Sequence, residues 1–284
     1  MVMEGIVMPK RPGWDSRRRN RNIGTSKSGK GSDNKLTIPQ AWLDDRCFHE
    51  KIINPIVFKR EINGNQFIFI VEGTQVGFCH ACTPHDIEFV LNLIPPEHLA
   101  EIKMIVLRQP KRKERILSSV WGRLLYWSDI LRFSGPAIHI EAQRVNSVLK
   151  HSKSLSTDEA LEIERLIRDG HNVRTNRRYH LISTSPDTVR RTQLYRTLPH
   201  EIGHYVDYLE SVELASGNND KEWSRLHDLY FTKPAKDKED FAHRYATEFY
   251  EQQRKLNNLP FDRIYKPNLL IELNLEPSWF YTES

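Results

Sequence analysis

The sequence predicts an α+β fold in which strands come first along the chain and helices follow. One observation is the length of 284 residues with 38% hydrophobic residues, which is enough for one large domain with a sizeable core. Helical spacing of apolar residues runs almost without a break from 185 to about 256. Earlier segments alternate or are continuously apolar, as strands are: 53–61, 66–72, 102–107, 121–130 and 137–142. Segregated strands and helices are typical of α+β proteins.

Residues 1–36 are predicted to be a flexible basic tail. Between Lys10 and Lys35 there are nine Lys or Arg residues against two acids, among many Gly, Ser and Asn. Such a segment cannot bury enough apolar surface to fold alone. It either makes weak contact with nucleic acid through phosphates or is a solvated leader without a partner. The remaining domain, 37–284, divides into a β-rich portion, 37–82, and a catalytic core, 83–284.

The first elements carry clear local signals. Asn63-Gly64-Asn65 supplies hairpin chemistry between the first two strands, and residues 75–80 are expected to form a third short strand. A helix is expected to begin at Pro84, with Thr83 as its N-cap and Asp86 completing a capping box. Pro95 and the proline after it end that helix.

Later segments are read in the same way. In 137–142, Ile138 and Ile140 fall on one face of the strand, with His139 and Glu141 on the other. Residues 156–159 predict another helix start, with Gly170 as a plausible C-terminal cap. Residues after 256 are expected to be largely irregular.

The composition limits the cellular location that we expect. No apolar run approaches the roughly 18–20 residues that span a bilayer, and residues 1–8 are too short for a signal peptide. Three cysteines exclude a disulfide framework, so a reducing, cytoplasmic location is expected. Cys79 and Cys82, together with His85, Cys47 and His49, suggest a second metal site; the alternative is that the cysteines are small buried residues.

The segment 198–208 carries the strongest chemical signal. His200 and His204 are four residues apart, so on a helix both imidazoles leave one face, as a tetrahedral Zn²⁺ requires. Glu201 lies beside them, where a carboxylate can exchange protons with an attacking water and a leaving amine. Asp207 follows on the same face and is expected to accept a hydrogen bond from a ligand histidine.

A catalytic zinc normally has three protein ligands and a water, so one ligand is missing from this motif. Glu210 follows closely, but a chain that stays helical would turn it elsewhere. Asp220 and Glu222 lie where a loop meets a helix start, a place typical of solvated acids. Glu239 is favoured, because it opens an amphipathic helix that can pack beside the histidines.

The amino-acid sequences of these two segments resemble those of a known family. His-Glu-Ile-Gly-His-Tyr-Val-Asp, followed 35 residues later by Glu-Asp-Phe-Ala, resembles the gluzincin metallopeptidases, particularly the anthrax-lethal-factor and Pro-Pro-endopeptidase group. The resemblance covers 198–249. It implies a zincin-like fold, with a mixed sheet over the metal-binding helix and a mainly helical C-terminal part. It also implies Zn²⁺ as cofactor, Glu239 as third ligand and peptide-bond hydrolysis with Glu201 as general base.

Two positions depart from that group. His243 stands where a second Glu is usual, and we expect it to contact the ligands without binding the metal. Thr232 stands where a tyrosine binds the oxyanion; Tyr230 is the nearest substitute, or it simply packs its ring. Zincin folds commonly bind substrate along an edge strand, for which His139 and Glu141 are candidates unless they are merely solvated.

The sequence therefore predicts a zinc endopeptidase acting on an unknown protein or peptide. Three alternatives stay open. The basic tail recruits the enzyme to DNA, where it digests bound protein; the zinc site belongs to a non-catalytic interaction or regulatory module; or the enzyme processes itself or acts as a toxin on one host protein.

Overall fold

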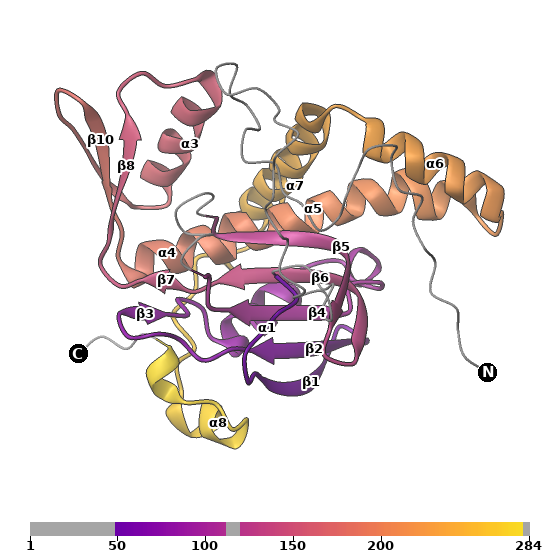
Figure 1. The fold of residues 1–284 in the computed structure, drawn as a ribbon, viewed down its shortest axis with the longest axis horizontal. Helices are drawn as coiled ribbons and strands as arrows, with labels where there is room; N and C mark the ends of the chain where they lie inside the picture. Colours follow the sequence, from indigo (N-terminus) through magenta and orange to yellow (C-terminus); the bar gives the residue numbers. More distant parts are fainter. Residues whose placement is uncertain (1–48, 112–119, 281–284) are drawn as a thin grey trace, which may run out of the picture. The chain divides into compact units, whose positions relative to one another are not determined.

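A five-stranded mixed sheet forms the centre of the structure, a computed structural model that describes residues 49–111 and 120–280 (Figure 1). The strand order is β1-β2-β4-β6-β5, with β2, β4 and β6 parallel to one another and an antiparallel strand at each edge. The predicted basic tail, 1–36, lies outside the described residues. The strands are β1 (Ile56–Ile62), β2 (Asn65–Val71), β4 (Met104–Arg108), β5 (Gly122–Ile130) and β6 (Phe133–Glu141).

The predicted hairpin between β1 and β2 is confirmed. Asn63 and Gly64 have φ of 49° and 76°, the left-handed pair that a tight two-residue turn requires. The Asn63 amide also donates to the carbonyl oxygens of Leu91 and Ile94 at 3.3 and 3.1 Å, which ties the turn to the neighbouring helix. The hairpin is thus fixed both by its own turn and by helix α1.

Helix α1 (Pro84–Leu91) begins where the sequence predicts. Thr83 Oγ1 accepts from the Asp86 N–H, and Asp86 Oδ2 accepts from the Thr83 N–H, both at 3.0 Å. This capping box satisfies two N–H groups at the helix start. A short 3₁₀ turn, η1 (Pro96–His98), follows the predicted stop.

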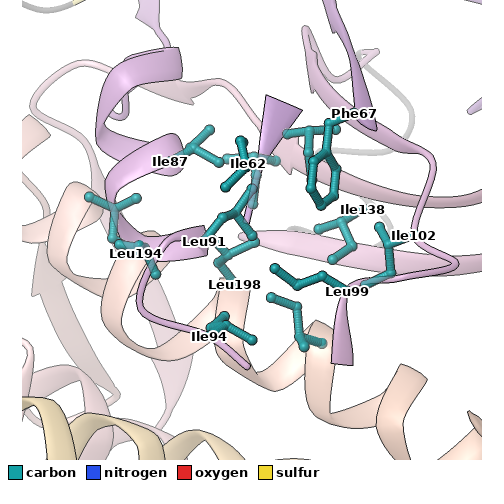
Figure 2. Packing of buried hydrophobic residues seen from close by; sticks show 14 of the residues in the cluster. Ile62, Phe67, Ile87, Leu91, Ile94, Leu99, Ile102, Ile138, Leu194 and Leu198 are labelled. Atoms are coloured by element: carbon teal, nitrogen blue, oxygen red, sulfur yellow. The ribbon is translucent and has the colours of Figure 1, made fainter. Parts of the chain in front are cut away.

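Helices α1 and α5 (Leu198–Tyr208) cover one face of the sheet, and the main core lies between them and the strands. Figure 2 shows Ile87 and Leu91 of α1 beside Ile62, Ile138 and Leu198. On the opposite face a smaller cluster forms around Ile70, Met104, Val106, Ile130 and Ala137. Because both faces carry buried apolar residues, β4 is apolar throughout up to its terminal Arg108, as a central parallel strand should be.

The third predicted strand is present but shorter than expected. Within 75–80, β3 (Phe78–Cys79) pairs with β7 (Gln143–Arg144) in a separate small sheet, and His80 forms a single bridge with Phe280. Gly77, with φ of 81°, and the Phe78 N–H donating to the Gln75 oxygen form a turn that prevents a longer strand. Strands β1 and β2, from the predicted β-rich portion 37–82, share one sheet with β4.

A second sheet was not predicted. It has the order β8-β10-β9, formed by β8 (Val148–Ser152), β9 (Asn172–Thr175) and β10 (Tyr179–Ser183). Helix α3 (Thr157–Arg168) packs on one face, and its predicted Ser156 cap is confirmed. These strands are only four or five residues long and carry Lys, Arg and His, so they lack the apolar alternation that marked the others.

The predicted helical C-terminal region is confirmed. A helical run extends unbroken from 186 to 214, and Pro199 lies in the first turn of α5 directly after a π-helical segment, where the wider turn accommodates the missing N–H. No helix in 49–111 or 120–280 is long and apolar enough to cross a membrane. The other elements are α4 (Pro186–Thr192), η2 (Gln193–Thr197), η3 (Leu209–Leu214), α6 (Asp220–Thr232), α7 (Ala235–Lys255), α8 (Pro267–Glu272) and η4 (Pro277–Trp279).

Candidate metal centre

Helix α5 presents the two motif histidines on the face that points away from the sheet. Leu198, Ile202 and Val206 of the same helix are buried in the main core. The rings of His200 and His204 are 4.6 Å apart between centroids, and both side chains are about seven-eighths buried, at 12% and 13% exposed. Amphipathic spacing thus anchors one side of α5 and leaves the imidazoles for another element.

That element is α7, which brings Glu239 to both histidines. Glu239 Oε2 is 3.3 Å from His200 Nε2, and Oε1 is 3.5 Å from His204 Nε2. Ligands bound tetrahedrally at about 2.0–2.2 Å lie about 3.3–3.5 Å apart, so these separations fit a zinc ion. Hydrogen bonds with His200 and then His204 hold the pKa of Glu239 well below its usual range. The Glu239 carboxylate therefore lies against both histidines, and two imidazoles with a carboxylate are a donor set that Zn²⁺ accepts.

Gly203 explains how the two helices come so close. A Cβ placed on Gly203 would lie 3.1 Å from Ala242 Cα and 3.0 Å from Tyr245 Cβ, both on α7. These contacts are tighter than packed side chains normally make, so any larger residue would force α7 outward. Gly203 was not among the site residues predicted from the sequence, although it lies inside the motif between the two histidines.

His243 supplies a second possible ligand set. It lies one turn after Glu239 on α7, with its Nε2 4.0 Å from Glu239 Oε2 and its ring 4.4 Å from that of His200. Ligand atoms of His200, Glu239 and His243 all fall within 4.8 Å of one another. Burial lowers the pKa of His243 to about 4, which favours the neutral imidazole that a metal binds. His200 and Glu239 belong to both sets, and His204 and His243 compete for the third place.

Zinc stoichiometry distinguishes the two sets. We expect His204→Ala to abolish stoichiometric zinc binding at micromolar protein, because it removes one of three ligands, and His243→Ala to retain about one zinc per chain. Metal content after gel filtration against a weak chelator measures this. The opposite pattern would assign the third place to His243 instead.

Glu201 faces the sheet side of the site. The residue is 9% exposed, and its Oε2 accepts a 2.7 Å hydrogen bond from the backbone N–H of Leu124 in β5. Burial raises the pKa of Glu201, and the neighbouring His200 and His204 oppose that rise. A buried carboxylate with a raised pKa beside two histidines is suited to proton transfer.

Asp207 does not play the expected part. Among the described residues its hydrogen bonds come from Lys233 Nζ, at 3.1 Å to each carboxylate oxygen, and from Ser211 Oγ at 3.4 Å. The Nδ1 of His200 is buried with no partner in that same part of the chain. Lys233 lies two residues before the first residue of α7, so its contact with Asp207 fixes the start of the helix that carries Glu239. Its support of the ligands is indirect.

Tyr230 is a packed ring, as the alternative reading had it. The residue is 3% exposed, and its hydroxyl lies 3.0 Å from the Tyr126 hydroxyl and donates to the His204 carbonyl oxygen at 3.3 Å. Burial raises the pKa of Tyr230 far above its usual range. Its hydroxyl is thus occupied in holding α6 to α5 and β5, and the assignment of an oxyanion role is corrected.

The predicted substrate edge is also corrected. His139 and Glu141 lie on β6, which pairs with β4 on one side and β5 on the other, and both side chains are buried. Glu141 Oε1 is 3.1 Å from Arg108 Nη1 in an ion pair of two buried side chains. The strand at the edge beside the metal centre is β5, whose Leu124 contacts Glu201. The alternation in β6 places His139 and Glu141 on the second face of the sheet, where buried polar side chains lie beside the smaller apolar cluster.

The remaining candidates lie apart from the centre. Glu210 is exposed on η3, and Glu222 pairs with Arg225 at 2.7 Å on α6, whose first residue is Asp220. Cys79 and Cys82 are buried free thiols, and the Cys82 Sγ lies 3.5 Å from Gln193 Oε1. Within the described ranges only the His200 cluster gathers three possible metal ligands. Cys47 lies outside those ranges.

Comparison of the chain with protein-family models, with curated proteins and with solved structures gives no match. The functional assignment therefore rests on the residues and geometry of this site. What they establish is a buried two-histidine helix, a carboxylate from α7 between the rings, and a second carboxylate held against an edge strand.

Proposed function

We propose that the chain is a zinc-dependent endopeptidase with a zincin-like architecture. The observation that carries this is the convergence of His200 and His204 with Glu239, at separations that suit tetrahedral zinc. Bound there, Zn²⁺ would act as a Lewis acid on the scissile carbonyl and on water. The mixed sheet, with its antiparallel edge strand beside the motif helix, supports the architecture.

In this proposal Glu201 is the general base. Its position next to both ligand histidines allows it to take a proton from the attacking water and return it to the leaving amine. The Leu124 N–H holds the carboxylate in one orientation, so the proton is exchanged from a defined place. Asp207 acts indirectly, because it holds Lys233 and thereby the start of α7.

Strand β5 is the proposed platform for the substrate backbone. It is an edge strand, and its Leu124 reaches the general base directly. An extended peptide can add to such an edge by main-chain hydrogen bonds, which aligns a peptide bond beside the metal. A protein or peptide is therefore the proposed substrate. The buried free thiols of Cys79 and Cys82 support the proposed reducing, cytoplasmic setting.

Peptide-library cleavage tests the proposal. Zinc-loaded protein is incubated with a library of protein-derived peptides, with Glu201→Gln protein as the blank, and products are identified by mass spectrometry. We expect a consistent set of cleavages that a chelator removes and added zinc restores. Stoichiometric zinc binding with products identical to those of the blank would reject peptidase activity.

The position of His243 favours one second candidate, a non-catalytic zinc module. Its imidazole lies close enough to Glu239 and His200 to complete a site together with His204. Four protein ligands would leave no place for water, as in structural zinc sites. X-ray absorption on the zinc-loaded protein counts imidazole ligands: two with a water favour the enzyme, and three favour the module.

A further inference from the structure

The outer face of the β8-β10-β9 sheet is unusually basic. Residues 143–153 and 171–183, which contain its three strands, include no Asp or Glu. They hold exposed cations on the strands and at the β9–β10 turn, and none of these makes an ion pair within 49–111 and 120–280: Lys150, Lys153, Arg174, Arg177 and Arg178. Two acids near this sheet, Glu162 of α3 and Asp169 directly after it, are already paired with Arg196.

The register of the strands places two of these cations, Lys150 and Arg174, in one row. Leu149, Ile182 and Val173 form one row across the sheet and pack against α3. Since strand residues alternate, the adjacent row of Lys150, Leu181 and Arg174 faces the opposite way. Two strand spacings put Lys150 and Arg174 about 10 Å apart, so one polyanion strand can contact both.

An aromatic ring accompanies the charges. Tyr179 lies two residues from Leu181 on β10, on the same outer face, and is 42% exposed. The Lys153 N–H donates to the Arg178 oxygen at 3.1 Å, which holds the basic turn beside the end of β8. Figure 1 shows α3 on one side of β8 and β10, with no described helix or strand on the other.

We propose that the basic end of this small sheet binds single-stranded nucleic acid. It comprises Lys150, Arg174 and Tyr179 on the outer face, with Lys153, Arg177 and Arg178 at the β9–β10 turn and the adjoining end of β8. A groove or face that combines unpaired cations with an exposed aromatic ring provides phosphate neutralisation and base stacking together. An acidic polypeptide would use the charges but leave the ring without a flat partner. A membrane surface would require a larger apolar component than one tyrosine and partly covered Leu181. This binding is separate from the proposed peptidase chemistry.

The test is fluorescence anisotropy of a labelled 20-nucleotide oligo(dT) with the full chain at several salt concentrations. The variant Arg174→Gln/Arg177→Gln/Arg178→Gln is compared with Arg254→Gln/Lys255→Gln/Lys266→Gln, which removes three exposed cations elsewhere. Loss of three phosphate contacts makes the negative slope of log K against log salt less steep by about two for a single strand. We expect this change, with at least tenfold weaker binding at 0.1 M salt, in the first variant alone. The basic residues between 10 and 35 are present in both variants, so their contribution cancels.

Substitutions of Tyr179 provide a second test of the proposal. Tyr179→Ala is expected to weaken oligo(dT) binding about fivefold or more, and Tyr179→Phe to leave it unchanged, because stacking needs the ring and not the hydroxyl. Equal losses in the two triple variants, or no binding at low salt, would overturn the proposal. So would poly-glutamate of matched charge competing as well as oligo(dT), which would assign the face to an acidic protein. Unchanged thermal unfolding shows that the variants are folded.

Discussion

Glu201→Gln is expected to lower the rate of peptide cleavage by about 10²- to 10⁴-fold while zinc stays bound. The amide keeps the size of the side chain, and its oxygen can still accept the hydrogen bond from Leu124 N–H. It cannot take a proton from water near neutral pH. The loss should therefore fall on turnover, with little change in metal content or thermal stability. Initial rates on the best library peptide, with zinc content measured on the same samples, give both quantities.

Glu210→Gln is the matched control. It makes the same chemical change on an exposed residue of the same helical run, away from the metal cluster. We expect cleavage within about twofold of the unaltered protein, as is usual for surface changes. If Glu201→Gln retained the full rate, Glu201 would not be the base and the proposed mechanism would be wrong.

Asp86→Ala should destabilise the fold by about 3–5 kcal/mol. Asp86 Oδ1 is 2.8 Å from Arg190 Nη2 and 2.9 Å from the Ile264 N–H, and Oδ2 accepts from the Thr83 N–H. The carboxylate is fully buried and Arg190 nearly so. Removing it leaves a buried guanidinium without its counter-charge and also removes one of the two hydrogen bonds of the α1 capping box. The change in the free energy of unfolding can be measured by guanidinium denaturation.

A second Asp–Arg pair nearby provides the comparison. Asp187 Oδ1 is 3.1 Å from Arg263 Nη2, but the aspartate is 50% exposed. Water and salt screen such a pair, so Asp187→Ala should cost no more than about 1 kcal/mol. Similar losses for the two variants would show that burial of the Asp86–Arg190 pair adds nothing to stability.

Local rules account for what could be predicted correctly. The turn at Asn63 and Gly64 and the caps at Thr83 and Ser156 depend on residues within a few positions of one another. The spacing of His200 and His204 likewise fixes their relative direction once the segment is helical. These features needed no knowledge of the rest of the chain.

The features that were predicted wrongly depend on contacts between residues that are far apart in the sequence. His139 and Glu141 alternate like edge-strand residues, yet β5 pairs outside β6, and both side chains are buried on the second face of the sheet. Asp207 has the correct spacing to reach a histidine, but Lys233 from the next helix takes its carboxylate. Sequence spacing gives the direction of a side chain but does not identify the element that reaches it.

The sequence by itself determined the two-histidine helix, its adjacent Glu201 and the order of strands before helices. It also singled out Glu239 as the favoured third ligand. Only the tertiary structure brought Glu239 between the histidines, through the close α5–α7 contact at Gly203, and placed His243 within reach of the same centre. The physical reason is that helix periodicity acts over one or two turns, whereas a metal centre depends on how closely separate helices pack.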